Sequence, residues 1–175
     1  MKGLRKDKAA PPDPLTAALR MLARRPYSVA EMRRALAKKY ADSNQVRKAL
    51  ARLRELRYLD DKKFAEHYAS SLARNRAYGR YRVRRELKAK LVDYRQIEPA
   101  LQQAFGETSE QELLERTLEK KVRSLRLPLT PAKLAALCQS LLRRGFRGED
   151  IMKAVRQRPE LKPITEDVEL GEDQL

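Results

Sequence analysis

Apolar residues recur every three or four positions along this chain, between charged residues, in nine separate stretches. This period is typical of amphipathic helices that bury one face. Asp13 before Pro14 combines an N-cap acceptor with proline at the first helical position. Ser28 followed by Glu31 has the spacing of a capping box. Ala, Leu, Arg, Lys and Glu dominate the composition and favour helices. The pattern therefore predicts nine helices and an all-α fold.

The predicted helices fall into three groups whose apolar positions align. An offset of 51 residues, followed by a further offset of 54, keeps five apolar positions in register. These positions are Met32, Leu36, Val46, Ala49 and Leu50, then Val83, Leu87, Ile97, Ala100 and Leu101, then Leu137, Leu141, Ile151, Ala154 and Val155. The alignment predicts an internal repeat of about 50 residues. Because units this small bury little surface alone, we expect three tandem three-helix repeats stacked into an elongated, curved array.

The expected repeats have a segment of different composition on each side. We predict a flexible basic arm over residues 1–13, repeats over 14–59, 60–106 and 107–158, and a disordered acidic tail over 159–175. The tail contains Pro159 and Pro163, and beyond Ile164 it carries five acidic residues and no basic one.

Charge is distributed unevenly around these repeats. The net charge is +16, with 27 Lys and Arg against 11 Asp and Glu up to residue 105, and 13 of each beyond it. A clustered basic surface indicates a polyanionic partner. The alternative is a solvated helical surface that is merely rich in arginine.

Residues that support catalysis or cofactor binding are scarce. His67, the only histidine, lies between Phe64 and Tyr68 on a predicted helix, which favours an ordinary surface or boundary residue. Cys138 stands among leucines and is interpreted as a buried, inert thiol. One histidine and one cysteine do not make a usual zinc site, and glycine-rich phosphate loops are missing from the sequence. We therefore expect a binding protein that is not an enzyme and uses no metal or cofactor.

The sequence also bears on the cellular location. A single cysteine fits a reducing compartment. Apolar runs are shorter than the roughly 20 residues that span a bilayer, and the N-terminal residues do not resemble a secretory signal. The expectation is a cytoplasmic protein with no membrane contact.

Basic residues flanking the apolar stripes of the first two repeats are the candidate contacts for the partner. They are Arg33, Arg34, Arg74, Arg80, Arg82, Arg84, Arg85 and Lys88. Arginine clamps phosphates or carboxylates, and the neighbouring Tyr78 and Tyr81 could stack on bases, although packing within the protein explains them equally well. Gly79 is expected to allow a sharp turn between two helices.

Residues 58–68 begin the second predicted repeat with a distinctive order, Tyr-Leu-Asp-Asp-Lys-Lys-Phe-Ala-Glu-His-Tyr, and Tyr78-Gly79, Arg82-Val83 and Glu86-Leu87 follow it. This arrangement resembles the central signature of the bacterial RecX family, regulators of the RecA recombinase. The other two repeats resemble the family at Ser28, Glu31, Met32, Arg33 and Leu36, and at Arg144, Gly145 and Phe146. Together the resemblance covers residues 15–157.

The resemblance implies a function as well as three repeats. A RecX-like protein would bind RecA and RecA–DNA filaments, lodge in the filament groove, and inhibit strand exchange and coupled ATP hydrolysis. It would thereby modulate homologous recombination, DNA repair and the SOS response. We expect a monomer, for which direct contact with single- or double-stranded DNA is a further expectation. The alternative is a basic helical-repeat protein that binds DNA directly through its phosphate backbone.

Two helix ends depart from the family pattern. Lys90-Leu91 stands where the family tends to have Lys-Gly, and Lys39-Tyr40 replaces a similar glycine-containing end. Leucine and tyrosine disfavour the left-handed conformation with which a glycine ends a helix.

Overall fold

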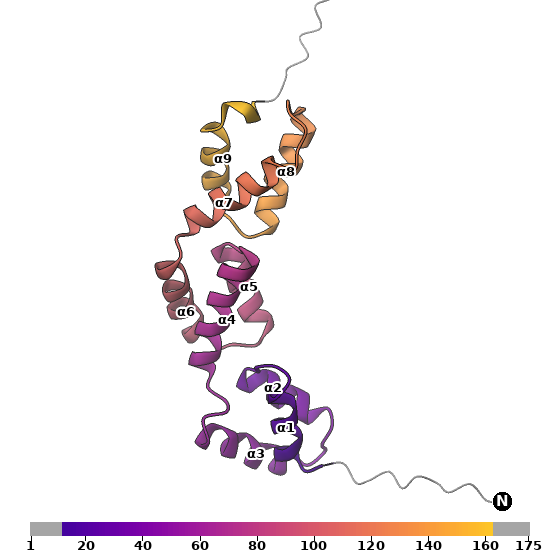
Figure 1. Cartoon of the computed structure of the whole chain (residues 1–175). Coiled ribbons are helices and arrows are strands. Elements are labelled where there is room, and N and C mark those ends of the chain that lie inside the picture. Colours follow the sequence, from indigo (N-terminus) through magenta and orange to yellow (C-terminus); the bar gives the residue numbers. More distant parts are fainter. Residues whose placement is uncertain (1–11, 163–175) are drawn as a thin grey trace, which may run out of the picture.

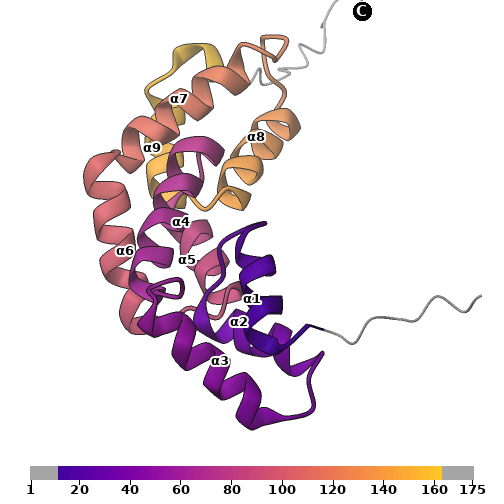
Figure 2. The same ribbon diagram turned by 60° about the horizontal axis from the view of Figure 1, so that its bottom comes forward.

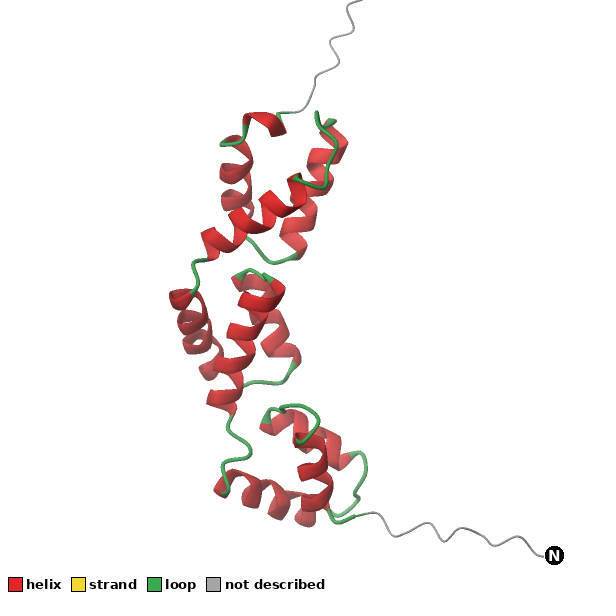
Figure 3. Cartoon of the chain, viewed as in Figure 1, coloured by secondary structure: helices red, strands yellow, loops and turns green. Residues whose placement is uncertain are grey.

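A computed structural model describes residues 12–162, which form nine α-helices and one 3-10 helix (Figure 1). The helices are α1 (Pro14–Leu22), α2 (Val29–Ala37), α3 (Ser43–Glu55), α4 (Asp61–Arg76), α5 (Arg80–Ala89), α6 (Tyr94–Glu107), α7 (Glu110–Val122), α8 (Pro131–Arg143), α9 (Gly148–Arg156) and η1 (Pro159–Leu161). Figure 3 shows only helices and loops in the described part, which confirms the all-α prediction. Nearly all of the predicted arm, and the tail from residue 163, lie outside the described residues.

The helices form three successive groups, α1–α3, α4–α6 and α7–α9, stacked end to end (Figure 1). The second view shows that the stack is curved (Figure 2). There α3, α6 and α7 follow the outer side of the curve, and α2, α5 and α8 lie toward its inner side. The elongated, curved array of three repeats is therefore confirmed.

Buried side chains confirm the alignment of the repeats. All fifteen aligned apolar positions are buried, and none is more than 7% exposed. In α1, Ala17 and Ala18 are buried, whereas Leu19 is 37% exposed. The small alanine side chains allow α1 to pack closely on the other two helices of its repeat.

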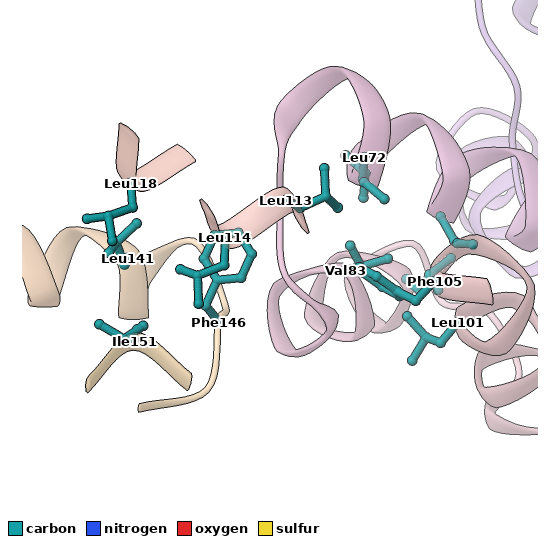
Figure 4. Packing of buried hydrophobic residues seen from close by; sticks show 14 of the residues in the cluster. Leu72, Val83, Leu101, Phe105, Leu113, Leu114, Leu118, Leu141, Phe146 and Ile151 are labelled. Carbon is teal, nitrogen blue, oxygen red and sulfur yellow. The ribbon is translucent and has the colours of Figure 1, made fainter. Parts of the chain in front are cut away.

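The buried side chains form two separate cores. One lies within the first repeat and includes Met32, Leu36 and Leu53. The other runs without interruption through the second and third repeats. Figure 4 shows Leu113 of α7 near Leu72 of α4, so that the third repeat continues the core of the second. The first repeat is therefore joined to the second mainly outside these apolar cores.

The two junctions between repeats share a pattern of hydrogen bonds. The first amide of α2, at Val29, donates to Asp61 Oδ1 over 2.8 Å. The first amide of α5, at Arg80, donates in the same way to Glu110 Oε1 over 2.7 Å. Each carboxylate belongs to the first residue of the next repeat's first helix. The internal repetition therefore includes the hydrogen bonds that join neighbouring units, as well as the buried core positions.

A second contact recurs one residue earlier in each repeat. The hydroxyl of Ser28, the N-cap of α2, donates to the carbonyl of Lys90 at the end of α5. Gly79, the N-cap of α5, donates its amide to the carbonyl of Arg144 at the end of α8 over 2.9 Å. The equivalent N-cap residues thus donate from a side chain at the first junction and from the backbone at the second.

The capping box predicted at α2 is only half formed. Ser28 Oγ accepts the amide of Glu31 over 3.0 Å, as predicted. The Glu31 carboxylate does not complete the box and instead pairs with Arg25 at 2.9 Å and Lys90 at 3.2 Å. Tertiary partners have replaced the local one, because both cations lie within reach of Glu31 in the folded chain.

The two unusual helix ends behave differently. Leu91 adopts the left-handed conformation, with φ of 58°, although a side chain there costs about 1–2 kcal/mol. Tyr40 is not left-handed, and its hydroxyl donates to the carbonyl of Pro12. Position 91 is thus left-handed in this chain although it carries a leucine.

The first residues of the predicted tail, from residue 159, pack against the third repeat. Pro159–Leu161 form η1, and the side chain of Leu161 is buried in the larger core. This corrects the predicted boundary, because an apolar contact holds the segment against the third repeat. Among residues 12–162, no helix has the length and apolar character needed to cross a membrane.

Candidate functional site

Four of the eight predicted binding cations are already held by carboxylates of the chain. The pairs are Arg74–Glu107, Arg80–Glu110, Arg82–Glu86 and Arg84–Glu98. In the last pair, two guanidinium nitrogens of Arg84 lie 2.9 and 2.7 Å from one oxygen of Glu98. Because Glu98 belongs to α6, this contact joins α5 to the neighbouring helix. Each of these four arginines therefore has a carboxylate partner within the chain, and only the Arg82–Glu86 pair, four residues apart on one helix, was visible in the sequence.

The other four predicted cations are Arg33, Arg34, Arg85 and Lys88, and their side chains are exposed. Within residues 12–162, none of them forms an ion pair with a carboxylate. Arg34 and Arg85 occupy equivalent positions, 51 residues apart, on α2 and α5. Both helices lie toward the inner side of the array (Figure 2). We call these four residues the inner basic surface, after the helices that carry them; the side chain of Arg33 also lines a cavity of about 550 Å³ beside α3.

The arginines at the start of α5 also contact aromatic rings. The guanidinium of Arg80 lies 5.3 Å from the ring centre of Phe105, and that of Arg82 lies 5.0 Å from that of Tyr78. Tyr78 is half-buried against the larger core, whereas Tyr81 is 51% exposed. Tyr81 is therefore the more accessible of the two rings predicted to stack on a ligand.

Gly79 does not make the sharp turn predicted for it. Its φ of −74° and ψ of 167° are open to any residue, and the left-handed residue in this connection is Ala77, with φ of 49°. Glycine is instead required by a close approach, because a Cβ at position 79 would lie 2.4 Å from the carbonyl oxygen of Gly145. The prediction failed because this neighbour is remote in sequence.

The histidine and the cysteine lie apart from the inner basic surface. Exposed His67 lines a cavity of about 410 Å³ between the first two repeats, together with the rings of Tyr27, Tyr58, Phe64 and Tyr68. Cys138 packs beside the larger core, and its burial raises the pKa of the thiol. The neutral thiol is a poor nucleophile. Among the described residues, no group of three or more His, Cys, Asp or Glu side chains could hold a metal ion.

A basic pocket at the junction of the second and third repeats was missed by the sequence analysis. Six of its lining residues are cationic, namely Arg74, Arg76, Arg116, Lys120, Lys121 and Arg144. They come from the end of α4, the face of α7 and the end of α8. The spacing of Arg116, Lys120 and Lys121 could have revealed a basic face on α7. The balanced charge beyond residue 105 concealed it. We call these six residues and their cavity the junction pocket.

Comparison with known proteins identifies the family. Models of the first, second and third three-helix domains of RecX match residues 15–53, 60–101 and 108–155. The regulatory protein RecX of Chlorobaculum tepidum is 39% identical over 140 residues, which cover 79% of this chain and 84% of that protein. This chain belongs to the RecX family. The regulatory protein RecX of Stenotrophomonas maltophilia is 31% identical over 147 residues, covering 84% of this chain and 88% of that protein.

Solved RecX structures share the fold. A crystal structure of RecX from Lactobacillus salivarius superposes with a TM-score of 0.69 at 21% identity, covering 82% of this chain and 93% of that chain. A second RecX crystal structure gives a TM-score of 0.66 and covers 80% of this chain and 70% of its own. The resemblance inferred from the signature residues is confirmed, and the chain is a member of a family of regulatory proteins.

Proposed function

We propose that this protein binds RecA, free and as a filament on DNA, and inhibits strand exchange and the coupled ATP hydrolysis. It would lodge in the filament groove as a monomer and so modulate homologous recombination, DNA repair and the SOS response. Membership of the RecX family supports the partner. We infer the mode of binding from Arg34 and Arg85, which are exposed and occupy equivalent positions on the inner helices of successive repeats.

Repetition makes the inner basic surface suited to a filament. A filament offers the same chemical groups at regular intervals, and successive repeats present cations at equivalent positions. Because Arg33, Arg34, Arg85 and Lys88 lack carboxylate partners among the described residues, their charges are available to an acidic surface or to phosphates. Such charge complementarity accelerates association and fixes register.

The first test measures ATP hydrolysis by RecA on single-stranded DNA, and strand exchange, with increasing amounts of this protein. Both rates are expected to fall as the protein is added. Unchanged rates at saturating protein would contradict the proposal.

Charge reversal tests the inner basic surface itself. Arg34→Glu with Arg85→Glu is expected to raise the concentration needed for half-inhibition about tenfold or more, because two attractive charges become repulsive. The matched control is Lys48→Glu with Arg95→Glu, which makes the same charge change on α3 and α6, at the outer side of the array. Equal losses in both variants would indicate a general charge effect and exclude a role specific to this surface.

Direct binding to DNA is the competing function, and salt distinguishes the two. Binding to a phosphate backbone weakens steeply between low salt and about 150 mM. We expect binding to RecA-coated DNA to persist at that salt while binding to bare single-stranded DNA becomes much weaker. Equal affinities for the two at this salt would favour direct DNA binding.

A further inference from the structure

The junction pocket is a cavity of about 680 Å³ between the second and third repeats. Its lining residues come from the end of α4, from α7 and from the end of α8. The continuous core beneath it fixes the two repeats relative to each other. Its cations are therefore held on a common framework although they come from distant parts of the chain.

Most of the positive charge in the junction pocket is unpaired. Arg74 pairs with Glu107. The other five cations, Arg76, Arg116, Lys120, Lys121 and Arg144, form no ion pair with a carboxylate in residues 12–162. Arg144 is nevertheless fixed in place, since its Nη1 donates to the carbonyl of Arg76 over 2.7 Å. The pocket thus combines high charge density with at least one oriented guanidinium.

The negative C-terminal ends of the nearby helices offset only part of this positive charge. Cations stabilise the C-terminus of a helix, and α4, α7 and α8 end at Arg76, Val122 and Arg143, near the pocket. Each such end carries roughly half a negative charge, so three ends offset about one and a half of the five unpaired cations. An excess of about three and a half positive charges remains, which an external anion can neutralise.

The types of the lining residues indicate the class of anion. In nucleic-acid complexes, phosphate oxygens accept hydrogen bonds from Arg, Lys, Asn, Ser and Thr side chains, and the junction pocket presents all five kinds. Phosphates therefore fit this set of donors. The lining residues include Asn75, Thr117 and Ser124 but no aromatic ring. Bases would have no platform for stacking, so recognition would be confined to the backbone.

We propose that the junction pocket binds consecutive phosphates of a nucleic-acid strand, without regard to base sequence. The proposal gives a location to the direct DNA contact expected from the family resemblance, and this site would not require RecA. It also assigns a binding role to the third repeat, whose charge together with the tail is balanced.

The test is a titration of the full chain with a fluorescent oligothymidine at several salt concentrations. Arg116→Gln, Lys120→Gln and Lys121→Gln are combined in one variant. Each phosphate contact contributes about 0.7 to the slope of log affinity against log salt for a single strand. The triple variant is therefore expected to reduce that slope by about 2 and to weaken binding equally for oligothymidine and oligoadenosine.

The matched control combines Lys133→Gln, Lys153→Gln and Arg156→Gln. These residues are exposed cations of the same repeat outside the junction pocket, so the change in net charge is identical. Circular dichroism verifies that both variants keep their helical content. An unchanged slope in the pocket variant, or an equal reduction in the control, would overturn the proposal.

Competition distinguishes phosphates from an acidic protein surface. Inorganic polyphosphate is expected to displace the oligonucleotide from the wild-type chain at a lower charge concentration than polyglutamate does. Equal or stronger displacement by polyglutamate would overturn the choice of nucleic acid and indicate an acidic protein ligand. Inhibition of RecA ATP hydrolysis by the same pocket variant is measured in parallel. Retained inhibition with lost DNA binding would leave the proposed function intact.

Discussion

At the scale of single residues, two glycines permit the close junction between the second and third repeats. Gly145 has φ of 91°, in a region that favours glycine. Gly79 has an ordinary conformation but lies directly against the Gly145 backbone. Tyr81 N donates to Gly145 O over 3.2 Å beside this contact. The backbones approach so closely because neither position carries a side chain.

Gly79→Ala is expected to lower the free energy of unfolding by about 1–3 kcal/mol, since the added methyl group overlaps backbone that cannot move independently. Its Cβ would stand 2.4 Å from Gly145 O and 2.7 Å from Phe146 N. Urea denaturation followed by circular dichroism measures the change.

Gly106→Ala is the control for this substitution. A Cβ at position 106 would meet no atom within 4 Å, and alanine favours a helix over glycine by about 0.5–1 kcal/mol. The control is expected to be neutral or slightly stabilising. A Gly79→Ala protein as stable as the control would show that the junction can relax at little cost.

At the scale of elements, the two junctions use equivalent positions but differ in chemistry. The first junction depends on the Ser28 hydroxyl and on Glu31, which pairs with Lys90 of α5. The second also has a carboxylate contact, from Glu110, but adds backbone hydrogen bonds and a continuous apolar core. Charged contacts respond to pH and salt, whereas apolar burial does not depend on ionisation. The first junction should therefore be the more sensitive to solution conditions.

Glu31 provides a test of this difference. Partial burial raises the pKa of its carboxyl, but hydrogen bonds from Arg25 and Lys90, together with their charges, outweigh this and hold the pKa below the ordinary 4.5. A lowered pKa in the folded state means that ionised Glu31 stabilises the protein above about pH 4.5, and this contribution is lost as the pH falls through the folded-state pKa.

Glu31→Gln should therefore lower the thermal midpoint at neutral pH, and the difference from the wild type should shrink in acid. Thermal denaturation at neutral pH and well below pH 4.5 measures it. The control Glu55→Gln is expected to change little at either pH, because solvent screens its exposed pair with Arg52. A difference for Glu31→Gln that stays constant or grows in acid would contradict the assignment.

At the scale of the whole molecule, two cores divide a chain of three repeats. The first repeat has its own core, and the second and third repeats share another. In stacked repeats, stability depends on each unit and on its interface with its neighbours. The first repeat should therefore open independently more readily than the second or third.

Leu36→Ala and Leu87→Ala form a matched pair that tests this division. The two leucines are fully buried at equivalent positions of α2 and α5. Each truncation should cost about 2–5 kcal/mol. Native-state hydrogen exchange is expected to show weaker protection mainly in α1–α3 for Leu36→Ala, and across α4–α9 for Leu87→Ala. Equal losses over the whole chain for both would indicate a single cooperative unit.

The sequence alone determined the helices, their grouping and the fifteen aligned core positions, along with the RecX signature. These features are local or periodic, because a helix that buries one face must place apolar residues every three or four positions. The approximate extent of the repeats followed from the same pattern. The cap at Asp13 could be predicted as well, since Asp13 accepts the amides of Leu15 and Thr16.

Only the tertiary structure decided which cations are free and which are held. Arg84 and Glu98 lie 14 residues apart on different helices, and Gly79 contacts Gly145 from another repeat. The junction pocket likewise gathers cations from α4, α7 and α8. Ion pairing and close backbone approach depend on distances through space, which are set by the packing of helices against one another. Periodicity along the chain carries no such distances, so a sequence can supply the charges while the fold assigns their partners.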